Sequence, residues 1–275
     1  YNLSEIDSLG VIDKKNNYVM RIHYYDSLVA YYPTEIIGSI KFEKDDIQRD
    51  ILNVYIFSYP KTYEIISIDS ITFYNDQYQP LTIGNQVWML KNLNVDHYRT
   101  GDNIPQVTDS VQWQNLVTGA WCFFNNDSAR EPILGKLYNW YSVNDSRGLA
   151  PLGWHIPTDE EWKTLEIFLG MSHSSSDSMG GRGNNEGGKL KETGLIKWSD
   201  PNTGATNETG FTALPGNFRR GNGWSFADGH DNGFWCSDQY NATMGLWRSL
   251  RYCYADIYRS PIFKNYGFSV RCVKD

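Results

Sequence analysis

The sequence predicts an α+β protein of two unequal parts: a small all-β repeat unit over residues 1–78 and a larger domain over residues 79–275. Three observations lead to this prediction. A segment near the N-terminus recurs at a fixed spacing, a later segment carries the start and stop signals of a helix, and short β-type runs separated by Gly and Asn fill most of the rest. The polar, turn-rich join Tyr74–Pro80 marks the boundary.

The N-terminal repeat has three copies, Tyr1–Val11, Tyr32–Phe42 and Tyr63–Phe73, each starting 31 residues after the last. The β-rich runs Val19–Asp26 and Ile51–Ser58 lie between the copies, and each follows a polar stretch, at 13–17 and 43–50. This order predicts antiparallel strands joined by polar turns. A short sheet of this kind is only marginally stable alone, so we expect it to pack against the larger domain or an upstream strand. We favour a spacer role for the unit over a binding role.

The larger domain begins with a predicted β-hairpin over Leu81–Val95, with Gly-Asn at its turn. Large apolar residues at spacings of three and four predict a short buried helix over Gly135–Val143. The clearest helix signal comes next: Thr158 is the expected N-cap, Glu161 completes a capping box and Gly170 ends the helix. Its apolar stripe consists of Trp162, Leu165, Phe168 and Leu169.

After this helix, Ser172–Gly188 is predicted to be a polar, glycine-rich surface loop. The rest of the chain is predicted to form short β segments, at Lys189–Trp198, Phe211–Phe226, Gly233–Tyr240, Gly245–Ser260 and Gly267–Asp275. Two helices among many short strands and long loops are therefore expected.

The charge pattern excludes several classes of partner. A net charge of −7 without a dense Lys/Arg run argues against nucleic acid. No apolar stretch approaches the roughly 20 residues that a transmembrane helix needs. The chain begins at Tyr1 without an initiator Met, which we interpret as a processed product or a trimmed chain from which any signal peptide or lipid-anchor Cys has already been removed.

Eight sequence blocks of the larger domain occur in this order: GNQVWMLKNLN, GKLYNWYSV, GWHIPTDEEW, GGKLKETG, GFTALPGNFR, FWCSDQY, WRSLRY and YGFSVRCVKD. From about Leu81 to the C-terminus they closely resemble the Fibrobacter succinogenes major paralogous domain, common in secreted and lipid-anchored proteins of Bacteroidetes. The resemblance implies a branch of the formylglycine-generating-enzyme-like group with a C-type lectin fold. It also implies kinship with the variable proteins of diversity-generating retroelements, and an outer-membrane lipoprotein as the expected setting.

The four cysteines, Cys122, Cys236, Cys253 and Cys272, allow three pairings, and no CxxC or Cys/His spacing indicates zinc. The family usually has Cys-Pro before GWH, paired with the Cys of the final VRCV, whereas this chain has Ala150 there. The resemblance therefore implies that Cys272 has lost its usual partner, with Cys122 as a candidate substitute.

The predicted ligand-binding surface lies between Trp224 and Phe263, where Tyr, Trp and Arg concentrate. These residue types dominate binding hot spots. The resemblance assigns recurring framework residues to the core: Trp235, Trp247, Leu250, Tyr266, Phe268 and Val270. The surface candidates are Trp224, Asp238, Tyr240, Arg251, Tyr252, Tyr254, Asp256, Tyr258 and Phe263. All of them except Trp224 are positions that would be randomised in a retroelement-diversified protein. Strand-like alternation from Arg248 to Asp256 predicts that only one face of this segment is buried.

Other candidate chemistry receives a structural interpretation. His155, in the apolar run GWHIP, is expected to be a hydrogen-bonded core residue rather than a general base. The acidic run 159–161 is expected to offset a helix dipole and cap free amides. Asp228, Asp231 and Asn232 offer the oxygen ligands that Ca²⁺ prefers, but without a DxDxDG pattern they are interpreted as loop-shaping residues. No cofactor is therefore predicted, with Ca²⁺ as the alternative.

These observations favour a secreted or cell-surface, non-enzymatic module that binds a protein or carbohydrate ligand. A structural adhesin or pilus-tip subunit is the first alternative, and an unpaired edge strand in residues 1–73 would favour it. An enzyme resembling the formylglycine-generating oxidases is the second. It would need a deep pocket with convergent titratable groups, and Cys236 and Cys253 are the thiols considered for a metal pair.

Overall fold

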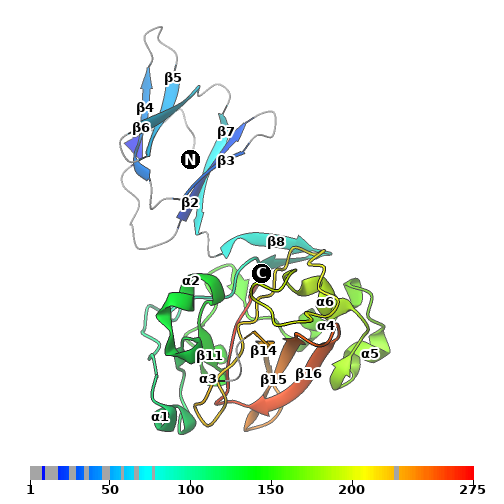
Figure 1. Ribbon diagram of the computed structural model, residues 1–275. Coiled ribbons are helices and arrows are strands. Elements are labelled where there is room, and N and C mark those ends of the chain that lie inside the picture. Colours follow the sequence, from blue (N-terminus) through cyan, green and yellow to red (C-terminus); the bar gives the residue numbers. More distant parts are fainter. Residues whose placement is uncertain are drawn as a thin grey trace. The chain divides into compact units, whose positions relative to one another are not determined.

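The computed structural model describes residues 78–225 and 229–275, together with seven strands of the N-terminal part (Figure 1). The chain divides into two compact units, Tyr1–Gln79 and Pro80–Asp275. In the described part of the chain, no helix combines the length and apolar character needed to span a bilayer.

The described elements of the first unit are all strands: β1 (Ser8–Leu9), β2 (Tyr18–Tyr24), β3 (Val29–Pro33), β4 (Ile37–Lys44), β5 (Asp50–Ile56), β6 (Tyr59–Glu64) and β7 (Ile68–Asn75). They pair antiparallel, as predicted, in two sheets ordered β1-β4-β5-β6 and β3-β2-β7. The repeat is visible in this order, because the equivalent Ser8, Ser39 and Ser70 lie in β1, β4 and β7. The polar turns predicted at 13–17 and 43–50 lie mostly outside the described residues.

The second unit is α+β. Its strands are β8 (Pro80–Ile83), β9 (Gln86–Met89), β10 (Trp121–Cys122), β11 (Leu137–Asn139), β12 (Trp154–His155), β13 (Gly180–Arg182), β14 (Asp231–Gln239), β15 (Met244–Arg251), β16 (Ile257–Phe263), β17 (Gly267–Phe268) and β18 (Val273–Lys274). Its helices are α1 (Ser110–Gln114), α2 (Glu131–Leu134), α3 (Trp140–Val143), α4 (Asp159–Phe168), α5 (His173–Asp177) and α6 (Glu186–Leu190), with 3₁₀ turns η5 (Phe124–Asn126) and η6 (Ser128–Arg130).

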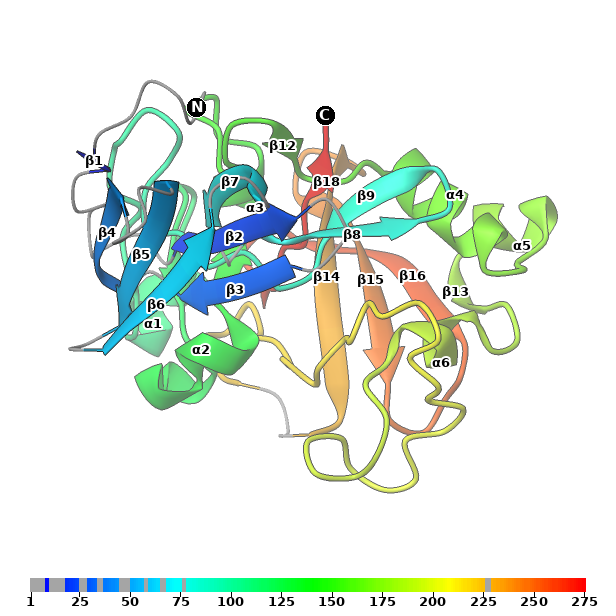
Figure 2. The same cartoon turned by 90° about the horizontal axis from the view of Figure 1, so that it is seen from above.

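Three antiparallel sheets organise this unit. The main sheet has the order β13-β16-β15-β14, and its three long strands stand side by side in Figure 2. A second sheet, β12-β18-β9-β8, brings the two ends of the unit together, because Val273 pairs with Trp88. The third sheet has the order β10-β11-β17.

Aromatic side chains fill the core between α4 and the main sheet. Trp162 of α4 lies 4.8 Å from Trp88 and 5.5 Å from Phe234, measured between ring centroids. Phe211 packs edge-on against Phe234 at 5.8 Å. All four are almost fully buried. Because a buried side chain of this size contributes about 1.5–3 kcal/mol, this cluster fixes α4 on the sheet.

Local signals predicted the hairpin and the main helix, although the hairpin ends at Met89 rather than at Val95. The β8–β9 turn contains Gly84, with a φ of 61° that favours glycine. In α4, Thr158 and Glu161 form the predicted capping box, and Gly170 follows the helix end with a φ of 115°. Phe168, however, lies on the exposed side of α4 rather than in the apolar stripe.

Other expectations were wrong because tertiary pairing overrides local pattern. The helix predicted over Gly135–Val143 begins only at Trp140, since Leu137–Asn139 forms β11 between β10 and β17. The predicted loop Ser172–Gly188 instead contains α5, β13 and the start of α6. The described part of the second unit therefore has six helices rather than two, five of them only four or five residues long.

Candidate binding site

Five of the nine predicted ligand-binding residues gather around the turn that joins β15 to β16: Arg251, Tyr252, Tyr254, Asp256 and Tyr258. We call this group the display turn. Arg251 donates from Nη2 to both carboxylate oxygens of Asp256, at 2.9 and 3.1 Å. Its guanidinium lies 4.1 Å from the ring centroid of Tyr254 and 5.0 Å from that of Tyr258. Stacking on both rings and the ion pair fix the arginine in place.

The display turn is partly exposed yet anchored to the core. Half of the Tyr254 surface is exposed, 50%. Tyr252 packs partly against the main core and stacks on His230, with ring centroids 4.6 Å apart. The turn therefore presents an aromatic and charged surface whose base is fixed.

A buried lysine holds the backbone of the display turn. The ammonium of Lys191, at the end of α6, donates to the carbonyl oxygens of Thr203, Arg251 and Tyr254, each at 2.9 Å. Three N–H donors thus meet three acceptors. Burial lowers the pKa of Lys191 to about 8. The sequence analysis missed this residue, because its role depends on carbonyls that only the fold brings together.

Two glycines let the neighbouring chain approach the turn. A Cβ atom at Gly181 would collide with the Asp256 carboxylate, and one at Gly187 with the Asp256 carbonyl oxygen. Gly181 also pairs with Tyr258 between β13 and β16. The glycine-rich segment predicted as a surface loop is therefore a packing surface for the display turn.

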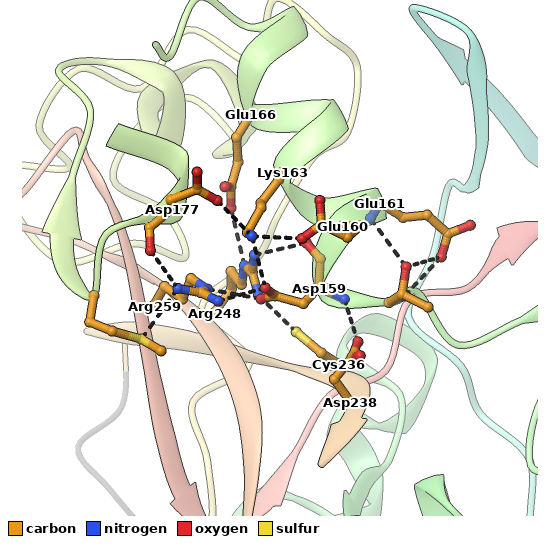
Figure 3. Close-up of polar contacts among 12 residues, drawn as sticks. Asp159, Glu160, Glu161, Lys163, Glu166, Asp177, Cys236, Asp238, Arg248 and Arg259 are labelled. Atoms are coloured by element: carbon orange, nitrogen blue, oxygen red, sulfur yellow. Dashed lines mark hydrogen bonds and ion pairs between the residues drawn. The ribbon is translucent and has the colours of Figure 1, made fainter. Parts of the chain in front are cut away.

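The remaining predicted site residues lie elsewhere. Tyr240 and Phe263 are exposed at the opposite end of β14–β16. The exposed Trp224 lies on a loop tied to this end by the bond from Asn265 Nδ2 to the Gly221 carbonyl, 3.1 Å. Asp238 accepts the backbone N–H of Asp159 at 2.5 Å, so it caps α4 (Figure 3). The nine residues therefore do not form one surface.

The prediction that only one face of Arg248–Asp256 is buried was wrong. Arg248, Ser249 and Leu250 are all buried, and β15 ends at Arg251. β15 lies between β14 and β16, with α4 over one face and Phe268 stacked on Trp247 over the other, 4.5 Å between centroids. Of the predicted framework residues all are buried except Tyr266, which is half-buried.

A closed network of charges lies beneath α4 (Figure 3). Arg248 donates to Asp159 and, at 3.1 Å, to Glu166, while Arg259 donates to Asp159 at 2.6 Å. Arg182 donates to Glu166 at 2.8 Å. Burial raises the pKa of Asp159, but Arg259 and Arg248 lower it by a larger amount, so this pKa lies well below its usual range. Burial raises the pKa of Glu166. These buried pairs join α4 to β13, β15 and β16.

All four cysteines are free. The suggested pairing of Cys122 with Cys272 is wrong, because Cys122 packs in the cluster around Trp113 whereas Cys272 lies beside β9, with its carbonyl accepting the Met89 N–H. Cys236 is buried 3.0 Å from Arg248 Nη1, and burial raises the pKa of its thiol to about 12. Cys253 is exposed in the display turn.

His155 is hydrogen-bonded, as predicted, but it lies at the surface rather than in the core. Nδ1 contacts Asp275 at 2.8 Å and Nε2 contacts Glu161 at 2.6 Å. Burial lowers the imidazole pKa, but the two carboxylates outweigh this effect and raise it overall. Glu161 therefore serves both the capping box and this ion pair.

The proposed oxygen ligands for Ca²⁺ are not grouped into a metal site in the part of the chain that the structure describes. Asp228 is outside them. Asn232 is buried and donates to the Leu214 carbonyl, and burial raises the pKa of Asp231. Over residues 78–225 and 229–275, no three His, Cys, Asp or Glu side chains are grouped to hold a metal.

One of three comparisons with known proteins identifies the same family as the sequence blocks. No curated protein and no solved structure matches the chain. The family model of the Fibrobacter succinogenes major domain matches residues 81–274, most of the second unit. The chain therefore belongs to the Fibrobacter succinogenes major domain family.

Proposed function

We propose that this protein is a secreted or cell-surface binding module, not an enzyme, and that it presents the display turn to a protein or carbohydrate ligand. The observation that carries the proposal is the arginine held between two tyrosines at the partly exposed end of the main sheet. Tyr and Arg dominate binding hot spots. Since Asp256 and Lys191 already fix the cluster, binding would cost little side-chain entropy.

A C-type-lectin-like fold is part of the proposal. Two facts support it: the family match over residues 81–274, and the sheet in which the first and last strands of the domain meet. Long segments of little regular structure lie between those strands and supply loops. In such a scaffold, fixed framework residues such as Trp235 would carry variable residues such as Tyr254.

Retroelement diversification is the finer version of this proposal, and DNA sequence tests it. The coding DNA for residues 234–265 should contain AAY-derived variable codons, with a near-identical template repeat and a reverse transcriptase gene nearby. Their absence would remove diversification and leave ordinary ligand binding intact.

The oxidase alternative is disfavoured by where the two thiols lie. Cys236 is buried in β14 beside Arg248, whereas Cys253 is exposed beyond the far end of β15. At about 3.3 Å per strand residue, they are too far apart to share a metal ion.

The adhesin alternative has one observation in its favour. Among the described strands of the first unit, β1, β3, β6 and β7 are edges of their sheets, and edge strands can pair with another chain. Filaments or strand-exchanged oligomers in the purified chain would favour this alternative over a binding module.

Arrays of immobilised glycans and extracellular proteins test the proposed function. Tyr254→Ala should abolish binding to the ligand that the wild-type chain selects, whereas Tyr240→Ala should leave it unchanged. The two tyrosines are matched, since 50% and 53% of their surfaces are exposed at opposite ends of the sheet. The reverse pattern would place the site at the Tyr240 end of the sheet. If the wild-type chain binds a ligand and neither substitution changes that binding, the proposal is overturned.

A further inference from the structure

Two adjoining cavities lie away from the display turn and share no residue with it. The first, about 490 Å³, lies between the α2 region and the segment 195–199; the second, about 320 Å³, lies against Asn92 and Arg271. Ile133 and Lys197 line both cavities. We call them together the basic groove. Each volume falls within the range of about 300–1,000 Å³ that is typical of ligand sites.

The lining of the basic groove is positive although the whole chain carries a net charge of −7. Its charged residues are Lys91, Arg130, Lys197 and Arg271, and no Asp or Glu lines either cavity. Outside the lining, Arg130 pairs with Asp127 at 3.4 Å and Lys197 pairs with Glu192 at 3.3 Å, so part of this positive charge is balanced. The charged side chains that line the cavities themselves are all cations, which favours an anionic ligand.

Arg271 is the central observation. It is almost fully buried, and it donates from Nε and Nη2 to the Asn92 side-chain oxygen, at 3.1 and 2.7 Å, and from Nη1 to the Phe211 carbonyl. Among the described residues no carboxylate pairs with it; burial alone lowers its pKa to about 9. Asn92 and Phe211 use three of its five N–H donors, so this buried cation lines a cavity with donors left for an anion.

The rim of the groove is aliphatic. Ile196 is 99% exposed, and Leu195 and Ile133 are each more than half exposed. A small molecule inside a 490 Å³ cavity could not cover an isoleucine that stands in solvent at its edge. An occupant that covers these side chains must extend beyond the cavities, as a polypeptide does.

We infer that the basic groove binds an extended peptide segment of a protein partner, whose carboxylate enters the Arg271 cavity and whose aliphatic side chains cover Ile133, Leu195 and Ile196. The carboxylate belongs either to the C-terminus of that segment or to an acidic side chain. A buried cation strengthens such a pairing because the surrounding dielectric is low.

Fluorescence anisotropy with the full chain and four labelled peptides tests this inference. The probes are Gly-Ala-Leu-Ile-Leu as the free acid and as its amide, and the amides of Gly-Leu-Asp-Ile-Leu and Gly-Leu-Asn-Ile-Leu. At least one carboxylate-bearing probe should bind about tenfold more tightly than its neutral match, and added salt should weaken it. The free-acid pair and the Asp/Asn pair tell a terminal carboxylate from a side-chain one.

Surface substitutions with matched controls locate the binding. Lys197→Gln and Ile196→Ser should each weaken binding about fivefold or more, whereas Lys274→Gln and Leu152→Ser, exposed residues outside the groove, should not change it. Tyr254→Ala should also leave it unchanged, which separates this site from the display turn. Three results would overturn the inference. The first is equal binding of the neutral and acidic probes, and the second is no peptide binding at about 1 mM. The third is that octanoate binds in a way that depends on Lys197 while the peptides do not bind.

Discussion

Strand β15 carries two arginines, three residues apart, that the fold uses in opposite ways. Arg248 is fully buried and is shared by Asp159 and Glu166 of α4. A quarter of the Arg251 side chain is exposed, and it pairs with Asp256 inside the display turn. Residue type alone therefore does not separate a structural arginine from one that is available to a ligand. The two differ in how deeply they are buried and in whether the paired carboxylate comes from a distant helix or from the same turn.

The largest expected contrast between the two regions is thiol reactivity. Cys253 lies in the display turn and Cys236 lies beside Arg248, so each thiol reports on one region. Cys253 should react with a colorimetric disulfide reagent at least about a thousandfold faster, because Cys236 reacts only after an opening that costs about 4 kcal/mol or more. Cys253→Ser should remove the single fast phase. More than one fast thiol would show that the buried region is open.

The next largest effect is on stability. Arg248→Met leaves Asp159 and Glu166 buried without their shared partner, so it should lower the free energy of unfolding by about 3–5 kcal/mol. Arg251→Met is the matched control and should cost less than about 1 kcal/mol. All ten Trp residues lie in the second unit, so their fluorescence during urea unfolding reports on it. Equal losses for the two variants would contradict the comparison.

Lys191→Met removes the donor that three carbonyls of the display turn and its neighbour share. Buried carbonyls without a donor should lower the free energy of unfolding by about 1–3 kcal/mol. Amide hydrogen exchange at residues 252–256 should also become faster. Lys189→Met, a lysine of the same helix with one carbonyl partner, should leave that exchange unchanged. Unchanged hydrogen exchange of the display turn in Lys191→Met would show that the contacts with Gly181 and Gly187 are enough to hold the turn.

The smallest expected effect concerns His155 and pH. Asp275 and Glu161 raise the imidazole pKa, so its stabilising contribution is complete below about pH 6.5 and is lost as the pH rises through the raised value. His155→Gln should lower the free energy of unfolding by less than about 1 kcal/mol at about pH 5.5, and by less still at about pH 9. His173→Gln controls for the loss of an exposed imidazole. A larger effect at high pH would refute the ion pair.

Features that depend only on residues close together in the sequence could be predicted. The Gly84 turn and the Thr158–Glu161 capping box depend on residues within one turn of each other, and both predictions are confirmed. The family could be identified from eight ordered blocks, and the match over residues 81–274 confirms it.

Features that depend on distant partners could not be predicted. Arg248 and Asp159 are 89 residues apart, and Lys191 and the Tyr254 carbonyl are 63 apart. Strand alternation failed at Ser249 because a central strand is covered on both faces. Within the predicted site, the sequence could not show that Tyr240 and Tyr254 lie at opposite ends of one sheet.

Oxidative footprinting of tyrosines, with and without a ligand selected on the arrays, tests the central claim most directly. If the display turn is the binding surface, Tyr254 and Tyr258 lose reactivity in the complex, while Tyr240, exposed at the other end of the sheet, keeps it. Protection of Tyr240 with Tyr254 still reactive would contradict the claim and place the ligand at the opposite end.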